Sequence, residues 1–232
     1  MLLEYINAPL SLRFMKSMEG RFQHGFCIKL AGPSNCGKTC TLLKLLEKKH
    51  YFTPQPPSRI IWISGSGVRD VEMESKIMSL YPDSEFHYQI PDDIENMARP
   101  FDLFVFDDLS GELQNNAGFT NCFTKVAHHK NCIFVYLTQN AFEKGRDATT
   151  RTRNCSYQIY FNNKTDVRWV RVLGDQLMGD SKKFAAIFKK AMDGPYSCLL
   201  VDNRPSTPPN EQFIGNAFEP TRENPCYFLA YK

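Results

Sequence analysis

One stretch of the chain has the residue types and the spacing needed to hold a triphosphate. The segment from 32 to 39 fits the P-loop pattern G-x-x-x-x-G-K-[ST] at every position, between an apolar run and a helix-like run. Its glycines let successive backbone N–H groups point into one concavity, and the start of the helix adds its dipole. We predict that ATP contacts nine residues here: Gly32, Pro33, Ser34, Asn35, Cys36, Gly37, Lys38, Thr39 and Cys40. Among them, Lys38 is expected to reach the β- and γ-phosphates, and Thr39 to offer its hydroxyl to Mg²⁺.

Two carboxylates follow a second apolar run, which spans residues 103–106. Folds of this kind place a metal-side acid at the end of a buried strand, facing the phosphate loop. We therefore assign Asp107 to the Mg²⁺ shell and Asp108 to polarising the attacking water, which predicts a hydrolase. The plainer alternative is a strand end that carries two solvated acids.

A third apolar run ends in an amide, Gln139. If this strand lies between the two motif strands, Gln139 faces the γ-phosphate and senses it. The alternative is that Gln139 only caps the strand. Cys36 and Cys40 also lie at the helix start, where a thiol can have a lowered pKa, so we expect alkylation to inactivate the protein and ATP to protect it.

The order of elements places these residues in an α/β fold. Apolar runs that predict strands alternate with segments that predict helices, which indicates a mostly parallel sheet with helices on both faces. This is the architecture of a P-loop NTPase of the RecA/ASCE-like kind. The predicted strands are 24–31, 60–63, 86–90, 101–106, 132–137, 156–161 and 197–201. The predicted helices are 39–49, 70–80, a short one that opens at 91–93, 120–129, 165–178 and 180–192.

Length and composition fit one globular domain. The chain has 232 residues, of which 42% are hydrophobic, and a net charge of +3, which is too small to indicate a nucleic-acid coat. We divide it into a lead-in (1–24), a P-loop ATPase domain (25–201) and an extended C-terminal tail (202–232). The eight cysteines include no C-x-x-C pair, so we expect reduced thiols and no zinc. No signal peptide and no run of transmembrane length is present, so we expect no membrane partner.

The three strand ends together resemble those of one family. Gly-Pro-Ser-Asn-Cys-Gly-Lys-Thr, then Phe-Asp-Leu-Phe-Val-Phe-Asp-Asp-Leu, then Val-Tyr-Leu-Thr-Gln-Asn look like the FtsK/HerA-type viral genome-packaging ATPases. The closest resemblance is to those of Polinton/Maverick-like elements and related double-stranded DNA viruses, and poxvirus-type packaging ATPases are more distant. The resemblance covers about residues 22–207.

This resemblance implies a motor that hydrolyses ATP to package double-stranded DNA into a capsid. The implied partners are double-stranded DNA, further copies of the chain in a homo-oligomeric ring, and a capsid or portal component. The implied location is inside the host cell, in the nucleus or at a cytoplasmic assembly site, or on the virion. The family's trans-acting arginine finger corresponds to Arg146, Arg151 or Arg153, and we favour Arg153. Asp108 departs from the glutamate that many relatives carry, which weakens the base assignment.

Several alternatives remain open at this stage. The excess of cations over residues 143–171, which begins at Lys144, predicts a subunit interface and a DNA-facing rim, but a solvated face would look the same. A small P-loop nucleotide kinase, or an ATP-binding assembly scaffold without turnover, would also use the segment 32–39.

Overall fold

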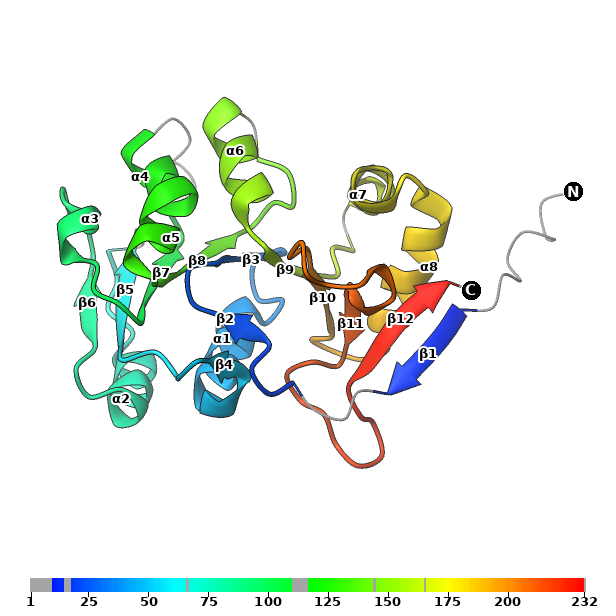
Figure 1. The fold of residues 1–232 in the computed structure, drawn as a ribbon, viewed down its shortest axis with the longest axis horizontal. Coiled ribbons are helices and arrows are strands. Elements are labelled where there is room, and N and C mark those ends of the chain that lie inside the picture. The colour runs from blue at the N-terminus through cyan, green and yellow to red at the C-terminus, as the bar shows by residue number, and fades with distance from the viewer. Residues whose placement is uncertain are drawn as a thin grey trace, which may run out of the picture.

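The computed structural model describes residues 10–14, 18–65, 67–109, 117–143, 145–164 and 166–231. Within these residues a ten-stranded sheet runs through the molecule in the order β1-β12-β11-β10-β9-β3-β8-β7-β5-β6 (Figure 1). A two-stranded parallel sheet, β2 (Phe22–Gln23) with β4 (Phe52–Thr53), lies beside it.

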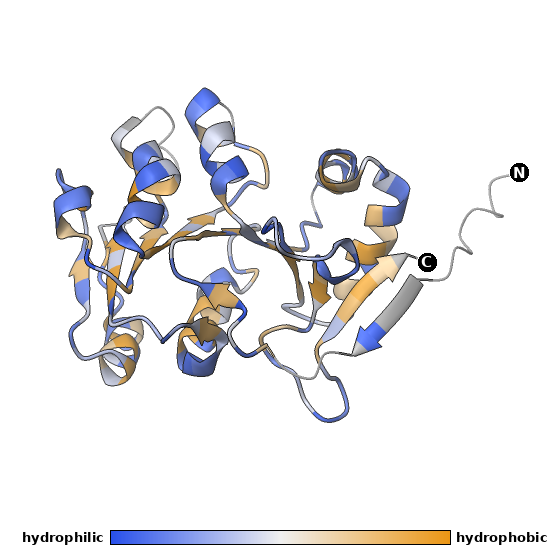
Figure 2. Ribbon diagram, in the orientation of Figure 1, coloured by the Kyte–Doolittle hydropathy of each residue, from blue (hydrophilic) through white to orange (hydrophobic). Residues whose placement is uncertain are grey.

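Six adjacent strands of the large sheet are parallel. They are β9 (Tyr157–Phe161), β3 (Cys27–Ala31), β8 (Ile133–Thr138), β7 (Asp102–Asp107), β5 (Arg59–Ser64) and β6 (Glu85–His87). Five of them, all except β6, are largely apolar and buried almost throughout, as a parallel sheet covered on both faces requires. Figure 2 shows these strands as the most hydrophobic part of the ribbon.

Helices cover both faces of this sheet (Figure 1). On one face α1 (Lys38–Glu47) and α2 (Val71–Leu80) pack against the sheet through Leu42, Leu45 and Ile77. The opposite face carries the remaining helices. These are α3 (Ile94–Met97), α4 (Ala117–Asn121), α5 (Ala127–Lys130), α6 (Arg146–Asn154), α7 (Arg168–Met178) and α8 (Ser181–Ala191), with the π-helical segment Cys122–Val126 joining α4 to α5. The predicted α/β class with helices on both faces is confirmed.

The predicted lead-in and tail are more ordered than expected. Strand β10 (Cys198–Asp202) pairs antiparallel with β9, and the tail then adds β11 (Phe213–Gly215) and β12 (Tyr227–Tyr231). From the lead-in, β1 (Leu10–Phe14) pairs with β12 at the edge, while residues 1–9 and 15–17 lie outside the described part. The tail is therefore an antiparallel extension of the sheet, and it departs from the simple extended wrap that its Pro and Asn content indicated.

Helix α6 is absent from the sequence-based prediction. Within Arg146–Asn154 only Ala148 and Arg151 are buried, so no apolar stripe marks the helix. It lies across the sheet above β8 and β3 (Figure 1). Part of the segment with excess cations, residues 143–171, is thus a helix that links β8 to β9.

Candidate active site

The P-loop connects the end of β3 to the start of α1 in a tight turn. Asn35 and Gly37 have positive φ angles, 60° and 100°, which curl the backbone between them. Gly32 is required for space, because a Cβ there would lie 2.7 Å from Cys36 Sγ and 2.7 Å from Phe161 Cβ. The sequence thus forms the curled loop before a helix N-terminus that the motif predicts.

Lys38 lies folded over this loop. Its Nζ donates hydrogen bonds to the carbonyl oxygens of Gly32, at 2.7 Å, and Pro33, at 2.9 Å. Lys38 is half-buried, and its ammonium group stays within the curl of the loop. A triphosphate held by the loop would meet this charge directly.

Strand β8 is inserted between β3 and β7, as predicted. Because the three strands are parallel, their carboxyl ends meet at one edge of the sheet. Backbone bonds join neighbouring strand ends: Gly32 N–H, after β3, donates to the Thr138 carbonyl of β8, and Gly65 N–H, after β5, donates to the Asp107 carbonyl of β7. The strand ends thus form one side of a common site.

A cavity of about 270 Å³ lies at this edge, and predicted residues from all three strand ends line it: Ser34, Asn35, Lys38, Thr39, Asp107, Asp108 and Gln139. The geometry therefore places the phosphate-loop lysine, both acids and the amide around a single space.

The two acids differ in environment. Burial and the neighbouring Asp108 carboxylate, opposed by Lys38, together raise the pKa of Asp107 to about 6. A divalent cation would compensate this buried carboxylate. Asp107 and the Thr39 hydroxyl are oxygen donors on the same cavity, which fits the ligand preference of Mg²⁺. Asp108 is exposed, with a positive φ of 54°, a strained conformation that occurs often at functional sites.

The structure corrects one candidate for the arginine finger. Arg151 is only 1% exposed, donates from Nη1 to Thr120 Oγ1 at 3.1 Å, and lies over the rings of Phe119 and Tyr136. A side chain buried in its own subunit cannot reach a neighbour, so Arg151 is excluded. Arg146 and Arg153, on the same helix, are exposed. Lys144 lies outside the described residues.

Among the cysteines, Cys36 differs from expectation. None of the eight forms a disulfide, and six of them are buried. Burial raises the pKa of the Cys36 thiol, and the nearby Lys38 only partly offsets this, so the lowered pKa expected for Cys36 is not found. Inactivation by alkylation stays a prediction. Cys40 is exposed at the start of α1.

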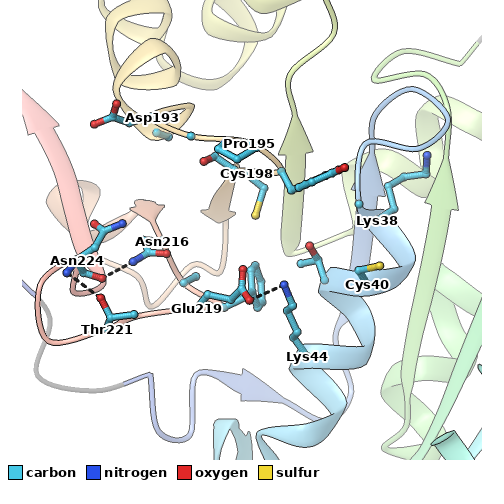
Figure 3. Close-up of a pocket in the computed structure, with 18 of the residues that line it drawn as sticks. Lys38, Cys40, Lys44, Asp193, Pro195, Cys198, Asn216, Glu219, Thr221 and Asn224 are labelled. Carbon is cyan, nitrogen blue, oxygen red and sulfur yellow. Dashed lines mark hydrogen bonds and ion pairs between the residues drawn. The ribbon is translucent and has the colours of Figure 1, made fainter.

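A second, larger cavity escaped the sequence analysis. It has a volume of about 1030 Å³ and begins at the P-loop, where Asn35, Lys38 and Thr39 line both cavities. It then continues along α1 to Lys44 (Figure 3). Its far walls come from the α8–β10 loop and from residues 216–227, which no motif marks. Only the fold brings these segments to the P-loop.

No helix in the described part of the chain is long and apolar enough to cross a membrane. The sequence matches no protein-family model, and it matches no curated protein.

The structure is similar to solved viral NTPases. One is the genome packaging NTPase B204 from Sulfolobus turreted icosahedral virus 2 in complex with sulfate, at 15% identity and a TM-score of 0.51, covering 78% of this chain and 93% of that one. Its complex with AMPPCP has 14% identity and a TM-score of 0.51, covering 79% and 95%. B204, the DNA-packaging ATPase from Sulfolobus Turreted Icosahedral Virus, has 10% identity and a TM-score of 0.50, covering 78% and 94%. At these identities the likeness establishes the fold, which is that of a P-loop NTPase.

Proposed function

We propose that this chain is an ATP-hydrolysing motor that packages double-stranded DNA into a capsid. The observation that carries the proposal is the single cavity where Lys38, Thr39, Asp107, Asp108 and Gln139 meet, at the ends of three adjacent strands with β8 inserted between the other two. The fold shared with packaging NTPases supports the same function.

Each residue around the cavity has a chemical task in this proposal. Lys38 binds the β- and γ-phosphates and compensates their charge. Thr39 and Asp107 would hold Mg²⁺, which neutralises charge on the same phosphates when it is bound. Asp108 is exposed to solvent at the cavity, so its carboxylate orients the attacking water and accepts its proton. The Gln139 amide contacts the γ-phosphate and the water.

The assembly around this site extends the proposal. We place the chain in the FtsK/HerA-type packaging ATPases and expect a homo-oligomeric ring in which Arg153 reaches the site of the next subunit. Arg153 is exposed near the end of α6, as this role requires. Double-stranded DNA and a capsid or portal component complete the expected partners, and the expected location is within the host cell or on the virion.

The test is ATP consumption, followed by chromatography of the nucleotides, with and without duplex DNA and over a range of protein concentrations. A ring motor should release ADP and phosphate, turn over faster with DNA, and gain specific activity as concentration rises. Lys38→Ala should abolish turnover. Phosphate transfer to a nucleoside monophosphate would identify a kinase, and ATP binding without turnover would identify a scaffold; either result rejects the motor.

A further inference from the structure

The larger cavity is continuous with the phosphate site. Asn35, Lys38 and Thr39 line both spaces, while Cys40, Thr41 and Lys44 line only the larger one. These last three follow one another along α1, so the cavity leads away from the phosphates beside the helix (Figure 3). This inference rests on the proposed function: in a bound ATP, the nucleoside attached to the α-phosphate would extend into this cavity.

The size and the walls of the cavity suit a nucleoside. Its volume of about 1030 Å³ is at the upper end of ordinary ligand pockets, which run from about 300 to 1,000 Å³. The lining combines carbon-rich groups with amides and hydroxyls, as in sites that bind a flat heterocycle and a sugar. The space therefore has room for a two-ring base and its ribose.

Tyr196 lines the larger cavity beside the P-loop. The residue is 71% exposed, and a Cβ built on the P-loop residue Gly37 would lie 3.3 Å from its Cδ1. The backbone of Tyr196 has a φ of 58°, a left-handed conformation that a bulky residue rarely adopts. Gly194, two residues earlier, has a φ of 150°, so the loop turns sharply just before it presents the ring.

An exposed aromatic side chain that lines a pocket, in a loop with a strained backbone, is well placed to contact a ligand. Aromatic side chains stack on nucleobases, and a two-ring purine overlaps a phenol ring more than a one-ring pyrimidine does. We infer that the larger cavity is the nucleoside subsite, that Tyr196 stacks on the base, and that the site prefers purine over pyrimidine triphosphates.

The outer wall comes from the C-terminal segment and is held by its own contacts. Lys44 of α1 forms an ion pair with Glu219, and the Asn216 side chain donates to the Asn224 carbonyl. Thr221 accepts from the Asn224 N–H at 2.9 Å (Figure 3). Because these polar groups bond to one another, they are not available to form hydrogen bonds with the edges of the base. The wall therefore encloses the base without selecting between purines. Adenine and guanine are therefore expected to bind with similar affinity.

The decisive experiment compares ATP with inorganic tripolyphosphate, which carries the phosphates without the nucleoside. Both are titrated with Mg²⁺ by calorimetry into the full chain and into Tyr196→Ala and Tyr196→Phe. Tyr196→Ala should weaken ATP binding by about tenfold, the loss expected for one stacking contact. Tripolyphosphate binding should be unchanged. Tyr196→Phe, which keeps the ring, should bind ATP like the parent.

A second readout locates the nucleoside against the C-terminal wall. Arg222 is exposed in the segment between Thr221 and Asn224 and is a site for trypsin. ATP should slow cleavage there, and tripolyphosphate should not. GTP should protect like ATP, and CTP and UTP should protect less at equal concentration.

The outcomes separate this inference from the proposed function. If the parent chain binds neither ATP nor tripolyphosphate, the proposed phosphate site fails and the inference fails with it. If the parent binds both and Tyr196→Ala keeps full ATP affinity, the stacking role is wrong while the phosphate site stands. If Tyr196→Ala weakens both ligands equally, the ring only supports the P-loop, and the inference is overturned.

Discussion

At the scale of single residues, Asp107 and Asp108 are chain neighbours with opposite surroundings. Asp107 is partly buried and has a raised pKa, whereas Asp108 is exposed in a left-handed conformation. The first environment suits a ligand to a cation, and the second suits a group that exchanges protons with water. This difference supports the division of roles that the sequence predicts.

Asp108→Asn should keep ATP binding and lose turnover, because the amide keeps the size of the carboxylate but cannot accept a proton. The expected loss in turnover is about 100-fold or more, as for removal of a general base. Calorimetry with ATP and a phosphate-release assay measure the two effects. Asp92→Asn, at an exposed acid outside the cavity, is the matched control. Normal hydrolysis by Asp108→Asn would show that another group activates the water.

At the scale of elements, helix α6 is tied to the P-loop strand by a buried lysine. Lys29 of β3 is fully buried, and its Nζ donates to the Ala141 carbonyl at 2.8 Å and to Thr152 Oγ1 at 2.9 Å. Burial lowers the pKa of Lys29, and Glu143 opposes the shift. The position of α6 on the sheet thus depends on a polar contact in addition to packing.

Lys29→Met should lower the melting temperature, because it leaves the Ala141 carbonyl and the Thr152 hydroxyl without their donor. The expected cost is about 1–3 kcal/mol for a buried group left unsatisfied. Thermal unfolding followed by circular dichroism measures it. The exposed Lys164→Met should change little. Equal stability of Lys29→Met and the parent chain would mean that packing alone holds α6.

The elements also show how far sequence alone can predict this fold. Strands β3, β7 and β8 are continuous apolar runs that end at the P-loop, at the two acids and near Gln139. The sequence therefore predicts that they are strands, their order, and the site at their ends. Helix α2 was equally clear, since Asp70 caps it by accepting from the Met73 N–H. Helix α6 was not readable, because a nine-residue helix with two buried side chains has no apolar periodicity.

Sequence patterns do not predict the strands of the tail or the larger cavity, for a different reason. Strand β11 has three residues and is separated from β12 by a loop rich in Pro and Asn, so local patterns indicated an irregular segment. Its strands form because β10 offers them an edge, a partner distant in sequence. Tyr196 carries no motif, and only the fold places it against Gly37.

At the scale of the whole molecule, Asp202 links the N-terminal segment of the chain to the end of β10. Its fully buried carboxylate accepts from Arg21 at 2.8 Å and from Arg204 at 2.7 Å. Burial alone would raise the pKa of Asp202, but hydrogen bonds from Arg204 and Arg21 outweigh it and lower the pKa. Arg21 is 181 residues away in sequence, so this pair fastens the N-terminal segment to the end of β10.

Asp202→Asn should destabilise the protein by about 3 kcal/mol at pH 7, because it leaves two arginines facing a neutral group. A carboxylate whose folded pKa is lowered contributes its stability above its ordinary pKa, 3.8, and loses it as pH falls through the folded pKa. The difference between parent and variant in chemical denaturation should therefore shrink below about pH 4. A constant difference across that range would contradict the ion-pair account. Asp193→Asn, at an exposed acid, is the control.

The proposed ring makes a prediction that no single subunit can test. Arg153→Ala should spare ATP binding and abolish turnover, with a loss of about 10³-fold or more, as for a missing arginine finger. Mixing it with Lys38→Ala subunits should restore activity, because those subunits supply Arg153 to an intact neighbouring site. The exposed Arg99→Ala, outside residues 143–171, is the matched control. Failure of the mixture to recover would transfer the role to Arg146.

The Lys29 contact has a consequence for timing in such a ring. Its two acceptors lie two residues after Gln139 and one residue before Arg153, so a single ammonium group links the segments that carry the proposed phosphate sensor and the proposed arginine finger. A change at Gln139 when the γ-phosphate is lost would then be accompanied by a change in the position of Arg153 toward the next subunit. Without the Lys29 contacts, the subunits of the proposed ring would hydrolyse ATP independently of one another. The cooperativity of turnover would then fall even where each site still works.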